Sequence, residues 1–376
     1  MSAVPPSRFA SFRMLAAAVL LAIVPVVRLA RDELRAAAVL TRSTGETSWL
    51  THRFDGPVRI EMVTIPSASG PIRARVYRST VSATAPGIVL LHGVQYLGID
   101  EPRLDHMASG LVGAGVTVLA PELTSLANYR LDPIAIEESR AAVRHLATDP
   151  RIYPHRVALA GASFAGGLAL AAACDPDTRA RLAAVLTLGA HHSVASVVRY
   201  LVGESLRTGA PAPNPYGLLV FVHTYAEHFV APAELDAFRA ALREQLYGNY
   251  ATSQRASAAL SVATRAFYVA LVRGELSLVA PTIRAALPAL EGPMAALSPA
   301  GHLAALRGLP VFLLHGARDN VVPPSESEAL AREIDATSAD LLITRAIDHV
   351  EVGGAVGLAE RLRVAHRLAR LFAVLR

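Results

Sequence analysis

The chain has 376 residues, 52% of them hydrophobic and 18% charged, a balance typical of a globular protein and not of a disordered one. All 36 basic residues are arginine, and the absence of lysine excludes Schiff-base chemistry, a Walker-type phosphate loop and a Ser-Lys dyad. The arginines are spread along the chain without a basic stripe, so we expect no nucleic-acid partner. The single cysteine, Cys174, permits no intramolecular disulfide, and we expect it to be a small buried residue.

The N-terminal segment is uninterruptedly apolar from residue 14 to residue 27 and is flanked by arginines. A spanning helix needs roughly twenty residues, so this stretch is short for one and suits the core of a signal peptide. We expect residues 1–45 to associate the protein with a membrane or to direct its export. An uncleaved anchor, a signal peptide and an amphipathic helix all remain open interpretations.

The first elements of the folded part are two alternating segments, residues 58–64 and 72–77. Turn-forming residues separate them, a pattern that predicts an antiparallel hairpin at the edge of a sheet. The pattern then changes to continuous apolar runs, which are typical of strands buried on both faces of a parallel sheet. These runs are residues 87–91, 116–120, 156–160, 184–188, 310–314 and 340–344.

Helical patterns lie between these strands, at residues 101–113, 133–146, after Phe164 and at 355–375. Strands and helices that alternate in this way form βαβ units. The sequence therefore predicts an α/β fold, with a mostly parallel central sheet flanked by helices.

The alternation stops between residues 190 and 307, where the pattern is mostly helical. We interpret this stretch as a helical cap inserted into one sheet domain. The predicted organisation is an N-terminal segment at 1–45, the first part of the core at 46–189, the cap at 190–307 and the second part of the core at 308–376. Apolar runs in the cap, at 216–230 and 266–272, favour an acyl or other hydrophobic substrate, although packing of the cap alone also requires apolar faces.

A serine stands at the predicted turn between a buried strand and a helix, in the sequence GASFAGG at residues 161–167. A sharp turn of this kind exposes the serine hydroxyl and needs small flanking residues, because the neighbouring backbone approaches closely. It also aims the unsatisfied N–H groups of the helix at the place where an oxyanion would form. Ser163 is therefore the candidate nucleophile.

To act as a nucleophile, a serine hydroxyl needs a general base, and that base must be oriented by a third group. Asp319 follows the predicted strand 310–314, and His349 follows the strand 340–344, so both lie at the carboxyl edge of the sheet. We predict His349 as the general base and Asp319 as the orienting acid. Asp348 and Glu122 are alternatives for the acid, but consecutive side chains point apart on extended backbone, which makes Asp348 less able to reach the imidazole.

Four motifs together resemble the α/β-hydrolase superfamily: LLHG at 90–93, GASFAG at 161–166, HGARDNVVP at 315–323 and DH at 348–349. The order Ser, Asp, His along the chain is the order of that superfamily. The resemblance covers roughly residues 57–190 and 308–376, and it implies a nucleophile elbow at Ser163. It further implies an oxyanion hole made by the backbone N–H groups of Val94 and Phe164. Ala165 stands where the common elbow has its last glycine.

Other histidines are weaker candidates for function. His191 and His192 follow a predicted strand, and His223 and His228 stand five apart in the cap, whereas a metal pair on a helix is spaced by three or four. Glu227 is the nearest carboxylate. We expect no metal and no organic cofactor, and we regard a polar spot facing the substrate as the better interpretation of the cap histidines.

These features predict a serine hydrolase that cleaves a carboxylester, thioester or lactone in a small, hydrophobic molecule through an acyl-enzyme intermediate on Ser163. An acyltransferase with the same triad and a non-catalytic scaffold are the alternatives, since a fold alone does not decide the chemistry. The sequence leaves the oligomeric state open.

Overall fold

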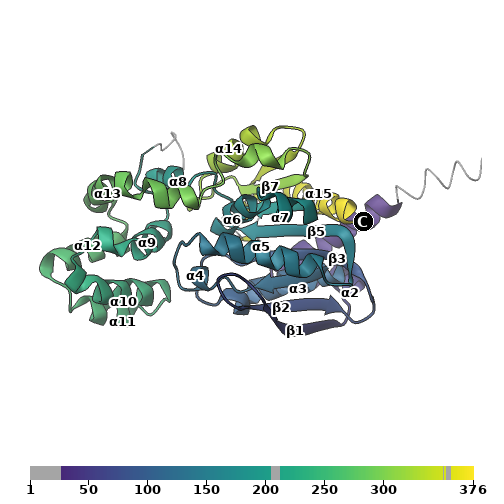
Figure 1. Cartoon of the computed structure of the whole chain (residues 1–376), viewed down its shortest axis with the longest axis horizontal. Coiled ribbons are helices and arrows are strands. Elements are labelled where there is room, and N and C mark those ends of the chain that lie inside the picture. The colour runs from purple at the N-terminus through teal and green to yellow at the C-terminus, as the bar shows by residue number, and fades with distance from the viewer. Residues whose placement is uncertain (1–26, 205–211, 350, 353–356) are drawn as a thin grey trace, which may run out of the picture.

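The computed structural model describes residues 27–204, 212–349, 351–352 and 357–376. Its centre is an eight-stranded sheet in the order β1-β2-β4-β3-β5-β6-β7-β8 (Figure 1). The strands are β1 (Val58–Ile65), β2 (Ile72–Ser79), β3 (Ala85–Leu91), β4 (Thr117–Pro121), β5 (Ile152–Ala162), β6 (Leu182–Leu188), β7 (Val311–Gly316) and β8 (Ala339–Thr344). A separate two-stranded ribbon pairs β9 (Ile347–Asp348) with β10 (Glu351–Val352).

The strand directions follow the predicted pattern. β1 and β2 form an antiparallel hairpin at one edge, and β2 is also antiparallel to β4. From β4 to β8 every neighbouring pair is parallel. All six of these parallel strands therefore end at the same edge of the sheet, where ligand sites of open α/β sheets form. The predicted α/β class and its mostly parallel sheet are confirmed.

Helices cover both faces of the sheet (Figure 1). On one face lie α4 (Thr124–Ala127), α5 (Ile134–Ala147), α6 (Phe164–Ala173), α7 (Pro176–Arg181) and α14 (Ser325–Ile334). On the other face lie residues 27–43, α3 (Pro102–Gly113) and α15 (Leu358–Leu375). A short helix, α2 (Trp49–Phe54), and the 3-10 turn η1 (Gly98–Asp100) complete this part of the chain.

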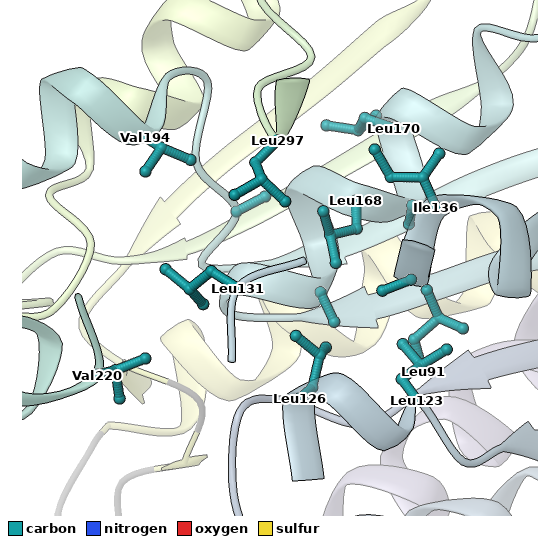
Figure 2. Packing of buried hydrophobic residues seen from close by; sticks show 14 of the residues in the cluster. Leu91, Leu123, Leu126, Leu131, Ile136, Leu168, Leu170, Val194, Val220 and Leu297 are labelled. Atoms are coloured by element: carbon teal, nitrogen blue, oxygen red, sulfur yellow. The ribbon is translucent and has the colours of Figure 1, made fainter. Parts of the chain in front are cut away.

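The larger hydrophobic core lies on the face covered by α5 and α6 and continues into the helical insertion. Figure 2 shows side chains from this core, among them Leu91 of β3 and Leu168 of α6, both at most 1% exposed. Complete burial of one such leucine contributes about 2–3 kcal/mol to stability. Cys174, at the end of α6, is half-buried where the sequence predicted full burial.

The segment between β6 and β7 is helical, as predicted, and forms a lobe beside the sheet (Figure 1). It contains α8 (Val194–Leu201), α9 (Pro215–Thr224), η2 (Ala226–His228), η3 (Pro232–Glu234), α10 (Leu235–Leu246), α11 (Tyr250–Ser257), α12 (Val262–Arg273), α13 (Leu276–Ala296) and η4 (Leu303–Leu306). The apolar side chains of α9 are buried in the core. Their hydrophobicity thus serves packing within the molecule, so α9 gives no independent support for a hydrophobic substrate, which stays a prediction.

The apolar segment at residues 14–27 lies outside the described residues except for Val27. The prediction of membrane association or export therefore stays a prediction. Across the described part of the chain, no single helix combines the length and the apolar composition needed to cross a bilayer. The helix at 27–43 packs against the sheet through Ala36 and Val39, both fully buried.

Candidate active site

Ser163 stands between the end of β5 and the first residue of α6. Its backbone has φ 55° and ψ −132°, a conformation that L-residues rarely adopt and that lifts the side chain out of the turn. A Cβ atom at Gly161 would lie 2.5 Å from the carbonyl oxygen of Ala165. The turn therefore requires glycine at 161, as the close approach predicted from the sequence implies.

The structure brings the three predicted side chains together. Oγ of Ser163 lies 3.0 Å from Nε2 of His349, and Nδ1 of His349 lies 2.8 Å from Oδ2 of Asp319. Asp319 comes from the loop after β7, and His349 directly follows β9. The contact between Ser163 and His349 joins residues 186 apart in the chain. Because Nδ1 donates to the carboxylate, Nε2 is free to accept the hydroxyl proton of Ser163.

The carboxylate of Asp319 is buried and fully engaged. Its Oδ1 accepts the backbone N–H groups of Val321 and Val322, each at 2.9 Å. Burial alone would raise the pKa of Asp319, but hydrogen bonds from His315 and His349 outweigh burial and hold the pKa below its usual value. Asp319 is therefore an anion at neutral pH and orients the His349 ring.

The two alternative acids take other roles. Glu122 pairs with Arg73, whose Nε lies 2.6 Å from its carboxylate, at the end of β4. The Asp348 side chain is exposed, and the carboxylate that His349 contacts belongs to Asp319.

The two residues predicted for an oxyanion hole both lie near Ser163. Phe164 is the first residue of α6, so its N–H has no partner inside the helix, and Ser163 makes no side-chain cap. Val94 follows β3 and lines the same cavity as Ser163. The hydroxyl of Tyr216, from α9, donates to the carbonyl oxygen of Val94.

A buried histidine holds the loop that carries Val94. Nε2 of His92 accepts the N–H of Leu123 at 3.0 Å, so its Nδ1 carries the proton and donates to the carbonyl of Gly93 at 2.8 Å. Burial lowers the pKa of His92, which keeps the ring neutral in this role. His92 and Gly93 were part of a recognised motif, but the positioning role of the imidazole was not visible in the sequence.

Three of the other histidines that the sequence singled out make structural contacts, whereas His228 is exposed. His191 is buried, stacks on the Phe164 ring with centroids 4.7 Å apart, and contacts the carbonyl of Leu297. His192 pairs with Glu333 at 2.6 Å. His223 is buried against the carbonyl of Tyr129, so its interpretation as a polar spot facing the substrate was wrong. Among the described residues, no group of histidine, cysteine and carboxylate side chains could hold a metal ion.

A cavity of about 1100 Å³ opens at Ser163 and His349. The insertion contributes only Asn214 and Tyr216 to its lining among the described residues, while most of the wall comes from the sheet and from the helices on the α3 and α15 face. Another cavity, of about 360 Å³, lies at the amino ends of β7 and β8 and contains none of the predicted site residues.

A comparison with protein-family models finds no match, and a search of curated proteins finds none either. Solved structures do match. The carboxylesterase EstE1, cloned from a metagenomic library, is 20% identical over 90% of this chain and 95% of its own, with a TM-score of 0.50. A variant of the esterase rPPE is 17% identical over 90% and 89%, with a TM-score of 0.51.

Another variant of rPPE, complexed with (S)-Ac-CPA, matches over the same shares with a TM-score of 0.50. Together with the strand order, these likenesses show that the chain has the α/β-hydrolase fold.

Proposed function

We propose that the protein is a serine hydrolase that cleaves an ester-type bond through an acyl-enzyme intermediate on Ser163. The observation that carries the proposal is the continuous contact from Ser163 through His349 to Asp319, at 3.0 Å and 2.8 Å. Histidine within hydrogen-bonding distance of a strained elbow serine, and itself oriented by a buried carboxylate, is the arrangement that activates a hydroxyl for acyl transfer.

In the first half of the reaction, Ser163 Oγ attacks the carbonyl carbon while its proton moves to Nε2 of His349. The imidazolium then gives that proton to the leaving oxygen, and the alcohol departs. In the second half, Nε2 takes a proton from water, the hydroxide attacks the acyl carbon, and Ser163 regains the proton as the acid is released. Asp319 keeps its charge throughout and stabilises the imidazolium.

The backbone N–H groups of Val94 and Phe164 hold the oxyanion of each tetrahedral intermediate in this proposal. Removing one such donor typically costs about 3–4 kcal/mol of transition-state stabilisation. No step needs a metal or an organic cofactor. The partner is a small ester that fits the cavity at Ser163.

The test is hydrolysis of p-nitrophenyl acetate by the purified full chain. We expect turnover in the parent protein, a loss of at least about a thousandfold in Ser163→Ala, and unchanged rates in Ser82→Ala, which removes an exposed serine outside the cavity. Equal activity in the parent and in Ser163→Ala would overturn the proposal. Product analysis with an added alcohol separates hydrolysis from acyl transfer, because a transferase yields a new ester instead of the free acid.

A further inference from the structure

The cavity at Ser163 does not stop at the carboxyl edge of the sheet but continues beneath the sheet, on the face covered by α3, α15 and residues 27–43. We infer that this deep part is the binding site for the acyl chain of the substrate, and that the substrates are esters of unbranched aliphatic acids. The inference rests on the proposed acyl-enzyme at Ser163 and adds the class of acid that the site takes.

The first observation is that two leucines in interior strands are only partly buried. Leu90 of β3 and Leu186 of β6 are each only partly buried, although their strands have a neighbour on both sides. Side chains on interior strands of a parallel sheet are normally covered by helices on both faces. Both leucines face the α3 and α15 side and line the cavity, so their exposed area is exposed to the cavity itself.

The second observation is that aliphatic side chains also make up much of the opposite wall. It is formed by three helices on this face, which contribute Leu40, Leu104, Met107, Leu111, Val364 and Leu368. Leu40, Leu104 and Met107 are partly buried, like the two sheet leucines. An apolar space of this size favours an apolar occupant, because filling it removes aliphatic surface from water.

The helices on this face also bring polar side chains to the cavity, among them Ser43, Thr44, Arg103 and His106. The hydroxyl of Ser43 donates to the carbonyl of Leu40 at 2.8 Å, and that of Thr44 donates to the carbonyl of Thr41 at 2.7 Å. These two hydroxyls thus offer the ligand little that would bind a polar group. The reactive polar groups lie at the Ser163 end, which suits a molecule with one ester and an apolar tail.

The depth of the cavity favours a chain longer than acetyl. Its lining includes Ile88 of β3 and His92, which directly follows that strand; four residues of extended backbone correspond to about 13 Å. An acetyl group would leave this space empty, whereas a longer chain would fill it. Because the helix at 27–43 supplies Leu40 to the cavity wall, that helix takes part in selecting the substrate.

The inference is tested with the full chain and p-nitrophenyl acetate, octanoate and palmitate. We expect kcat/KM for octanoate to exceed that for acetate at least about tenfold. Leu40→Trp should abolish this preference, because the indole would occupy the space that the longer acyl chain fills. Leu34→Trp is the matched control, since Leu34 lies on the same helix with its side chain 45% exposed; it should retain the preference.

Leu104→Trp, on α3, is a second variant whose indole would fill the cavity. Circular dichroism checks that each variant folds. Acetate hydrolysis without any preference for longer chains would overturn the inference and leave the proposed hydrolase intact. A preference that Leu40→Trp and Leu104→Trp both retain in folded protein would overturn it as well, because the chain would then lie elsewhere.

A binding measurement separates this inference from the chemistry. Ser163→Ala protein is titrated with cis-parinaric acid, whose fluorescence rises in an apolar site. We expect saturable binding that Leu40→Trp weakens at least about tenfold and Leu34→Trp does not change. No binding, or binding that Leu40→Trp leaves unchanged, would refute the proposed acyl-chain site even if the parent protein hydrolyses esters. Saturable binding with no hydrolysis of any ester would instead support the site and count against the proposed function.

Discussion

Nε2 of His315 lies 3.4 Å from Oδ2 of Asp319, the same oxygen that accepts the proton of His349. His315 is fully buried at the end of β7; its Nε2 also contacts the carbonyl of Val322 at 2.9 Å, and its Nδ1 contacts Ser327. A carbonyl only accepts, so Nε2 carries the proton and points toward both oxygens. Asp319 is thus supported by two histidines, of which only His349 reaches Ser163.

Loss of the His315 donor should weaken catalysis without removing it. In His315→Ala we expect kcat to fall about tenfold, because the carboxylate of Asp319 loses one of the hydrogen bonds that hold it in place as an anion. His315→Gln, whose amide can donate, should recover part of the loss. Steady-state kinetics on p-nitrophenyl acetate check this, and an unchanged kcat in His315→Ala would show that His315 only fills space.

Asp319→Asn should be far more damaging. An amide can donate to Nδ1 of His349, which leaves the proton on Nε2, where it cannot accept from Ser163. We expect kcat to fall about a thousandfold to ten-thousandfold with a small change in KM. Steady-state kinetics on p-nitrophenyl acetate measure this change. The same substitution at the exposed Asp348 should leave the rate within about twofold, and the reverse result would assign the acid role to Asp348.

Tyr216 is the contact between the helical insertion and the loop that carries Val94. Tyr216→Phe removes the hydroxyl and leaves the Val94 carbonyl without this donor, so the loop should hold its N–H less firmly. We expect kcat to fall about fivefold to tenfold, the cost of one neutral hydrogen bond. Tyr268→Phe is the control, because its hydroxyl bonds Ser253 outside the cavity. Equal kinetics in both variants would contradict the role of Tyr216.

Glu138 makes the stability of the protein depend on pH. Burial in α5, assisted by the charge of Asp132, raises the pKa of Glu138 to about 7, and its Oε2 has no hydrogen-bond partner. The folded state therefore binds a proton more tightly than the unfolded state, so this contribution is complete below the unfolded pKa and is lost as pH rises through about 7.

Glu138→Gln removes the buried charge. We expect the variant to be more stable than the parent by about 2 kcal/mol near pH 8 and to differ little near pH 5. Urea unfolding at the two pH values measures the difference. A variant that is destabilised equally at both values would mean that the carboxylate makes a contact that favours the native state.

The sequence predicted the sheet and the elbow because their signals are local. Continuous apolar runs mark the buried strands, and GASFAGG marks the turn at Ser163. Asp319 and His349 were predictable because each directly follows a strand, and parallel strands deliver such residues to one edge.

Other features depend on packing between distant segments and leave no local pattern. The support of Asp319 by His315 and of Val94 by Tyr216 joins residues whose hydrogen-bonding roles only the tertiary structure defines. The apolar run of α9 carries the same hydrophobic signal whether it packs or binds a ligand, and in the structure it packs. The cavity beneath the sheet likewise depends on where the helix 27–43 lies.

The most direct test of the central claim is covalent labelling of the purified full chain with a fluorophosphonate, followed by intact mass and peptide mapping. The account predicts one adduct, on Ser163, that is absent in Ser163→Ala and at least about a thousandfold slower in His349→Ala. A folded protein that gives no adduct, even with a small probe, or an adduct on another serine, would contradict the claim that His349 and Asp319 activate Ser163.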